Sequence, residues 1–197
     1  MTDLSRKIYT RFGDRGQTKL LSGETVAKDA LCVNTYGAVD ELQSHLGMAR
    51  SLIREESLRA ILHALQKDLF VAGAELASTS KRLSQLGNRL TTKDVTKLEA
   101  WIDEIAEQFG MPGRFVIPGT SPESAALHVA RSVCRRVERL IIGLNRSTGT
   151  YKELIVYFNR LSDLLFVLAW ASSVTSVIEF VLAELTAVAS PSSKGRL

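Results

Sequence analysis

Long stretches of helical periodicity, with few prolines or glycines after residue 50, constrain the fold of this 197-residue chain more than any other feature. Apolar residues recur there at intervals of three and four, the spacing of one helix face. No window alternates strongly enough to predict a strand. The pattern therefore predicts an all-α bundle of five helices. They are expected at about 30–52, 56–79, 92–109, 121–145 and 152–188.

The segments outside these patterns read as loops and tails. The stretch "GMPGRFVIPGTSPES" (110–124) holds three of the four prolines and should stop one helix and start the next. Ser121 can cap that next helix with Pro122 in its first position, and Thr91 or Thr92 can cap the helix before it. The expected organisation is an N-terminal segment at 1–29, the bundle at 30–190 and a disordered tail at 191–197.

Composition and charge exclude several classes of protein. The net charge of +4 is mild and no Lys/Arg run occurs, so nucleic acid is not an expected partner. The two cysteines are too few for a disulfide framework, and the N-terminus has no apolar signal core. The window 164–185 is long enough to span a membrane, but Ser, Thr and Glu interrupt it. A buried bundle helix is preferred over a membrane span, and a cytoplasmic location is expected.

A helix at 128–145 should have two unlike faces. At 100° per residue, Arg131, Arg135 and Glu138 form one stripe. The opposite side is apolar and consists of Ala130, Val133, Cys134, Val137, Leu140, Ile141 and Leu144. One interpretation is a solvated face whose arginines pair with Glu138. The other is an anion site, since four arginines in nine residues face one carboxylate and arginine suits bidentate phosphate contacts.

Polar residues elsewhere could complete such a site. Asn159, Asp163 and Phe166 lie on one face of the last predicted helix, where a structural network is the alternative to a ligand site. Asp40, in "YGAVDEL", is a candidate partner for one of the arginines. The stretch "YTRFGDRGQTKL" (9–20) has three cations, one carboxylate and two glycines, so it is either a frayed tail or a loop that holds an anion.

Other kinds of site have little support. The chain has no Walker phosphate loop, and its histidines do not have the spacing of metal ligands. His128 is expected on a helix surface or packed against a loop. No Ser/His/Asp arrangement or cysteine beside a histidine suggests an activated nucleophile.

Several blocks together resemble one known family. They are "YTRFGDRGQTKL", "YGAVDELQSHLG", "FVIPGT", "SAALHVARSVCRRVERL" and "YFNRLSDLLFVLA". In this order, between about residues 8 and 170, they resemble the ATP:cob(I)alamin adenosyltransferases of the propanediol-utilisation (PduO) type. The resemblance implies a five-helix bundle that forms a homotrimer, with active sites between subunits. It also implies transfer of the 5′-deoxyadenosyl group of ATP to the cobalt of cob(I)alamin, with release of triphosphate.

The resemblance also assigns roles to residues. In the family an N-terminal segment wraps ATP, which enters with Mg²⁺ and needs no dedicated protein cage for the metal. The implied ATP-binding residues are Thr10, Arg11, Phe12, Gly13, Thr18, Lys19, Lys28, Arg135, Arg136, Val137, Glu138, Arg139 and Asn159. Arg131 would pair with Asp40 across the subunit boundary, and these two act in catalysis with Arg135 and Phe115. A reductase and an adenosylcobalamin-dependent acceptor enzyme are implied partners.

Some positions depart from the family pattern, which leaves affinity and loop order open. They are Phe12, Gln17, Thr25, Cys32, Gln43 and Trp170. For Phe115, the family role is an aromatic under the corrin ring that displaces the lower ligand of cobalt. The alternative is an aromatic that anchors its loop over the bundle end. For the whole chain, the alternatives to the enzyme are a non-catalytic cobalamin carrier and a structural bundle without a ligand.

Overall fold

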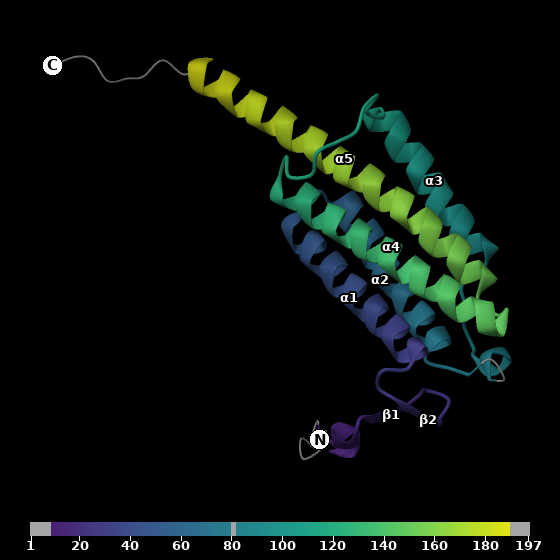
Figure 1. Ribbon diagram of the computed structural model, residues 1–197. Helices are drawn as coiled ribbons and strands as arrows, with labels where there is room; N and C mark the ends of the chain where they lie inside the picture. Colours follow the sequence, from purple (N-terminus) through teal and green to yellow (C-terminus); the bar gives the residue numbers. More distant parts are fainter. Residues whose placement is uncertain (1–8, 80–81, 190–197) are drawn as a thin grey trace, which may run out of the picture.

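Five helices form the body of the protein in the computed structural model, which describes residues 9–79 and 82–189 (Figure 1). They are α1 (Leu31–Leu52), α2 (Glu56–Leu76), α3 (Thr92–Phe109), α4 (Pro122–Thr148) and α5 (Lys152–Ala189). The predicted all-α bundle is confirmed. Two ends differ slightly from the approximate predicted ones, because α2 stops at Leu76 and α4 continues to Thr148.

The core lies between α4 and its neighbours. Helix α4 packs against α1 on one side and α5 on the other, while α1 also contacts α2 and α5 also contacts α3. The predicted apolar face of α4 is buried, apart from Leu140, which is partly buried. Its burial turns the arginine stripe of α4 away from the core, so the same periodicity that builds the bundle also exposes the cations.

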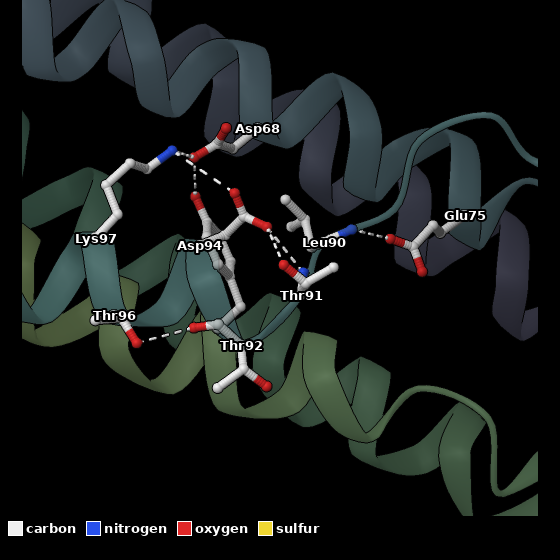
Figure 2. Close-up of polar contacts among 9 residues, drawn as sticks. Asp68, Glu75, Leu90, Thr91, Thr92, Asp94, Thr96 and Lys97 are labelled. Carbon is white, nitrogen blue, oxygen red and sulfur yellow. Dashed lines mark hydrogen bonds and ion pairs between the residues drawn. The ribbon is translucent and has the colours of Figure 1, made fainter.

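Side-chain caps fix where α3 and α4 begin. Asp94 Oδ2 accepts hydrogen bonds from Thr91 N at 2.8 Å and from Thr91 Oγ1 at 3.0 Å at the start of α3 (Figure 2). At the start of α4, Ser121 Oγ accepts from Ser124 N at 3.3 Å, and Pro122 is the first helical residue. Both predicted caps, Thr91 and Ser121, are confirmed.

The cap of α3 gives a stability prediction. Asp94→Ala removes the acceptor of both Thr91 bonds, so the free energy of unfolding should fall by about 1 kcal/mol. Chemical denaturation measures this loss. Glu104→Ala is the matched control, because Glu104 is exposed in the middle of the same helix. Equal losses in the two variants would show that the cap contributes nothing specific.

Two short strands, which the sequence did not predict, follow the N-terminal turn. Strand β1 (Gln17–Lys19) pairs antiparallel with β2 (Thr25–Ala27), with Thr18 opposite Val26. Three residues are too few to show an alternating pattern, so the expectation of no strand was wrong for a physical reason. The hairpin holds residues 17–27 in a defined loop beside the first turn of α1 (Figure 1).

The C-terminal part of α5 projects beyond the bundle (Figure 1). Residues 161–173 are largely buried, whereas Val177, Phe180, Leu182 and Leu185 are each at least half exposed. The prediction of a buried helix over 164–185 is therefore correct for its first half and wrong for its second. By length and apolarity α5 could cross a membrane, but its first half is the core helix of this bundle.

Candidate functional site

The N-terminal segment gathers cations around a glycine. Arg11 has a left-handed backbone (φ 60°), and its guanidinium lies 5.7 Å from the centre of the Tyr9 ring. Lys28 reaches back to Gly13, where a Cβ would come within 2.7 Å of the Lys28 Nζ atom. A larger residue at position 13 would force the flexible end of the Lys28 side chain to move aside. Lys19 Nζ lies 5.2 Å from the centre of the Phe12 ring, so this departure from the family pattern orients a lysine.

The hairpin is attached to the end of α2. Leu21 N donates to Ala77 O at 2.8 Å, and Thr79 N donates to Ser22 Oγ at 3.2 Å. Thr79 Oγ1 also donates to Glu24 Oε1 at 3.3 Å. These contacts place residues 9–28, with four cations and two carboxylates, at one end of the bundle (Figure 1).

Helix α4 presents its arginines to two separate clefts. We call the first the arginine cleft, which has a volume of about 640 Å³ and lies between α3, α4 and α5. Arg131 and Arg135 line it together with Met111 and Phe166. Arg131 Nε is buried and has no hydrogen-bond partner among the described residues. A buried, unpaired N–H of this kind is costly unless a hydrogen-bond partner arrives.

The arginine cleft carries balanced formal charge. Arg160 donates to Glu99 at 3.1 Å and to Asp163 at 2.6 Å, and all three residues line the cleft. Asp103 is a third carboxylate beside the three arginines. The expected arginine excess on α4 is therefore offset here by carboxylates from α3 and α5. A strongly anionic ligand would need further cations from elsewhere.

The second cleft, which we call the loop cleft, lies between α4, α1 and the α3–α4 loop. Its volume is about 570 Å³, and Arg136, Arg139 and His128 line it with Pro118 and Gly119. Arg136 forms an ion pair with Glu41 of α1, and Arg139 Nη1 donates to Arg135 O at 3.1 Å. Val137, by contrast, is fully buried in the core, so its side chain faces neither cleft.

The acidic member of the stripe is held by the last helix. Glu138 Oε1 accepts from Asn159 Nδ2 at 3.1 Å, so the family-implied residues Glu138 and Asn159 are brought together. The alternative pairing of Glu138 with the arginines of α4 is not formed among the described residues. Asn159 and Asp163 are exposed, and both have partners in this polar network.

Asp40 lies apart from the arginines in this chain. It is exposed and lines a groove between α1 and α2 with Tyr36 and Gln43. No ion pair joins it to an arginine among the described residues, so it is not a partner for an arginine within one subunit. Residues 10–28, Thr10 and Thr18 among them, likewise make no hydrogen bond or ion pair to α4 in the part of the chain described.

Phe115 projects from the loop that joins α3 to α4. It is fully exposed, with a relative accessibility of 103%, and Ile117 beside it is 87% exposed. The alternative in which Phe115 fills a gap and anchors the loop is therefore wrong for a single chain. Two neighbouring exposed apolar side chains on a loop are typical of a binding surface.

His128 is buried, which excludes the helix-surface alternative and agrees with packing against a loop, since it lines the loop cleft with Pro118 and Gly119. Its relative accessibility is 5%, and its ring stacks edge-on against Phe166 at 6.1 Å. Neither ring nitrogen has a hydrogen-bond partner among the described residues. Burial, and then the nearby charge of Arg131, lower the pKa of His128. The imidazole is therefore neutral at physiological pH and packs between the two clefts.

Several contributing residues escaped the sequence analysis. Arg160 was visible in "YFNRLSD", where its i,i+3 spacing to Asp163 predicts the ion pair that forms. Glu41 directly follows Asp40 in the sequence, and it is Glu41 rather than Asp40 that forms an ion pair with Arg136. No sequence pattern pointed to Met111, because its position in the arginine cleft depends on the path of a loop.

Comparison with known proteins connects this arrangement to one class of transferase. The model of the cobalamin adenosyltransferase family matches residues 8–172. The chain belongs to the cobalamin adenosyltransferase family. A corrinoid adenosyltransferase of Citrobacter freundii is 48% identical over 163 residues, covering 83% of this chain and 93% of that protein. One from Bacillus subtilis is 37% identical over 186 residues, covering 92% of this chain and 94% of that protein.

A solved structure matches as well. It is a variant of a PduO-type ATP:corrinoid adenosyltransferase from Lactobacillus reuteri, complexed with cobalamin and ATP. The TM-score is 0.80 at 33% identity, and the match covers 85% of this chain and 91% of that chain. The resemblance drawn from the sequence blocks is confirmed, and with it the enzyme class of corrinoid adenosyltransferase.

Proposed function

We propose that this protein transfers the 5′-deoxyadenosyl group of ATP to the cobalt of cob(I)alamin, and that its active sites form between neighbouring copies in a homotrimer. The observation that carries this proposal is the exposed Phe115 and Ile117 loop beside the arginines of α4. An apolar loop suits the face of a corrin ring, and arginines suit a triphosphate. Both surfaces lack an occupant within the described part of one chain.

The chemistry needs positioning rather than a protein nucleophile. Cob(I)alamin is the nucleophile: its cobalt electron pair forms the bond to C5′ of ATP. The C5′–O bond breaks, and triphosphate leaves with the electron pair of that C5′–O bond. The protein holds cobalt and C5′ in line and stabilises the charge that grows on the leaving oxygens. Arg135 is suited to stabilise that charge, because it is exposed in the arginine cleft and pairs with no carboxylate among the described residues.

A neighbouring copy supplies what one chain lacks. The arginine cleft has as many carboxylates as arginines, so it attracts a triphosphate weakly by itself. The segment 9–28 carries an excess of cations, and its residues 10–28 make no hydrogen bond or ion pair to α4 of their own chain among the described residues. Residues 1–29 are therefore proposed as an ATP-binding segment that reaches the α4 of the next subunit. Thr10, Arg11, Phe12, Gly13, Thr18, Lys19 and Lys28 would line it.

The pairing of Asp40 with Arg131 across that boundary can be tested. Arg131 Nε is buried without a partner among the described residues, and Asp40 is exposed on another face of the same chain. Asp40→Asn and Arg131→Gln should each lower kcat/KM, and a double-mutant cycle should give an interaction energy of about 1–3 kcal/mol. The cycle of Asp40→Asn with Arg146→Gln is the control, since Arg146 is exposed at the end of α4. Additive losses in both cycles, or an active monomer in sedimentation, would contradict the composite site.

Mg²⁺ would enter with ATP. Among the described residues no group of three or more His, Cys, Asp or Glu side chains is placed to hold a metal ion. Phosphate oxygens are the preferred ligands of Mg²⁺ in such complexes, with one or two carboxylates from the protein. Glu138, which lies among the proposed ATP-binding residues, would be such a carboxylate. Its partner Asn159 would fix its orientation.

The cell context follows from the substrates. ATP and reduced corrinoid are expected together in the cytoplasm, where a reductase would generate Co(I) and an acceptor enzyme would take adenosylcobalamin. The competing function is a non-catalytic cobalamin carrier with the same fold. A carrier has no need of a cationic segment at residues 9–28.

Protection from protease tests the ATP segment directly. Trypsin can cut after Arg11, Arg15, Lys19 and Lys28, all of which are exposed. ATP should slow these cuts if the segment closes on the nucleotide, whereas cuts after the exposed Arg146 should be unaffected. Equal rates with and without ATP would remove residues 9–28 from the nucleotide site.

A further inference from the structure

Trp170 connects α5 to the start of the loop that carries Phe115. Its indole Nε1 donates a hydrogen bond to Gly110 O at 2.9 Å. Gly110 caps the C-terminus of α3 and has φ 66°, a left-handed value that favours glycine. The chain leaves α3 at this residue, so the indole N–H fixes the point from which the loop departs.

The rest of the loop has few restraints of its own. Between Met111 and Thr120, all of them described, no residue makes a hydrogen bond to the rest of the described chain. The next fixed point is Ser121, whose hydroxyl caps α4. Phe115 lies between these two anchors and is fully exposed. The position of its ring therefore depends on the anchors rather than on packing of the ring itself.

Trp170 also lies on the face of α5 that borders the arginine cleft, without being one of the residues that line it. Asp163, Phe166 and Trp170 follow one another at i, i+3 and i+7, on one face of α5. The first two line the arginine cleft, and Met111, the residue after Gly110, lines it as well. A shift of Gly110 would move Met111 within the cleft and change the reach of Phe115.

We propose that Trp170 is a positioning residue, which holds the 110–121 loop so that Phe115 meets the corrin ring while Met111 closes the arginine cleft. This role rests on the proposed function of Phe115. An arginine at this position would also offer an N–H donor to a carbonyl.

The loop anchor is tested first without turnover. Trp170→Phe keeps an aromatic ring and removes the N–H donor. Trypsin cleavage after Arg114, which is exposed in the loop, should become about three- to tenfold faster, the change expected from one neutral hydrogen bond. Trp101→Phe is the matched control on α3, where the indole ring contacts Lys97 rather than the loop. Equal cleavage rates in wild type and Trp170→Phe would overturn the anchor.

Activity then separates positioning from simple stability. Trp170→Phe should lower the rate from cob(II)alamin with a reductase about three- to tenfold, and the rate from chemically reduced cob(I)alamin less. Trp170→Arg should restore both the rate and the resistance of Arg114 to trypsin, because it returns a donor. An equal loss of rate on both routes, or no recovery in Trp170→Arg, would mean that Trp170 contributes only to packing. If the wild-type protein formed no adenosylcobalamin, that result would count against the proposed function. The rate of trypsin cleavage after Arg114 would still show whether Trp170 anchors the loop.

Discussion

Arg135→Lys is expected to lower kcat/KM for ATP by about 10- to 150-fold, which corresponds to about 1.5–3 kcal/mol of transition-state stabilisation. The side chain is exposed in the arginine cleft and pairs with no carboxylate among the described residues. A guanidinium group can bind two phosphate oxygens through its planar fork. The lysine ammonium keeps the charge but offers only a point contact.

Stability should hardly change in this variant, since Arg135 is exposed and its backbone remains helical. Arg146→Lys on the same helix is the control and should have near-wild-type kinetics. Steady-state kinetics with varied ATP and saturating cob(I)alamin supply the measurement. An Arg135→Lys enzyme with wild-type kcat/KM would exclude Arg135 from the triphosphate site.

Phe115→Ala is expected to impair the route from cob(II)alamin on the order of 100-fold, equivalent to about 2.7 kcal/mol. In the role proposed for it, the ring of Phe115 lies under the corrin ring and acts as a wedge that displaces the lower ligand of cobalt, which makes reduction to Co(I) possible. Pre-formed cob(I)alamin has no lower ligand to remove. The rate from that substrate should therefore fall far less.

The structure separates this role from packing. A buried phenylalanine costs about 3–5 kcal/mol of stability when truncated to alanine. Phe115 is fully exposed, so the variant should unfold at the wild-type denaturant concentration. Ile117→Ala is the control for general loss of apolar loop surface. Electron paramagnetic resonance of bound cob(II)alamin with ATP should show a four-coordinate signal in wild type that is lost in Phe115→Ala. Persistence of that signal in the variant would refute the proposed role of Phe115 as the wedge that displaces the lower ligand.

Helical periodicity predicted the bundle well because the apolar spacing and the backbone hydrogen bonds of each helix involve residues that are close together in the sequence. The caps at Thr91 and Ser121 follow from side-chain chemistry within one turn, so they too were predictable. The apolar face of α4 was assigned correctly for the same reason. Its arginines then had to face outward, whatever the ligand.

Contacts between distant segments were less predictable. The exposure of α5 over residues 177–186 depends on where the neighbouring helices end, which the apolar composition of α5 does not reveal. The burial of His128 depends on Phe166, a residue 38 positions away along the chain. Arg136 meets Glu41 rather than Asp40, and one step along a helix turns a side chain by about 100°.

The central claim is catalysis, and anaerobic turnover tests it most directly. The protein is incubated with ATP, Mg²⁺ and chemically reduced cob(I)alamin, and the absorption spectrum and released phosphates are followed. The account predicts conversion to adenosylcobalamin with one triphosphate released for each corrinoid converted. Tight binding of cobalamin with no adenosylcobalamin and no consumption of ATP would contradict it and identify a carrier instead.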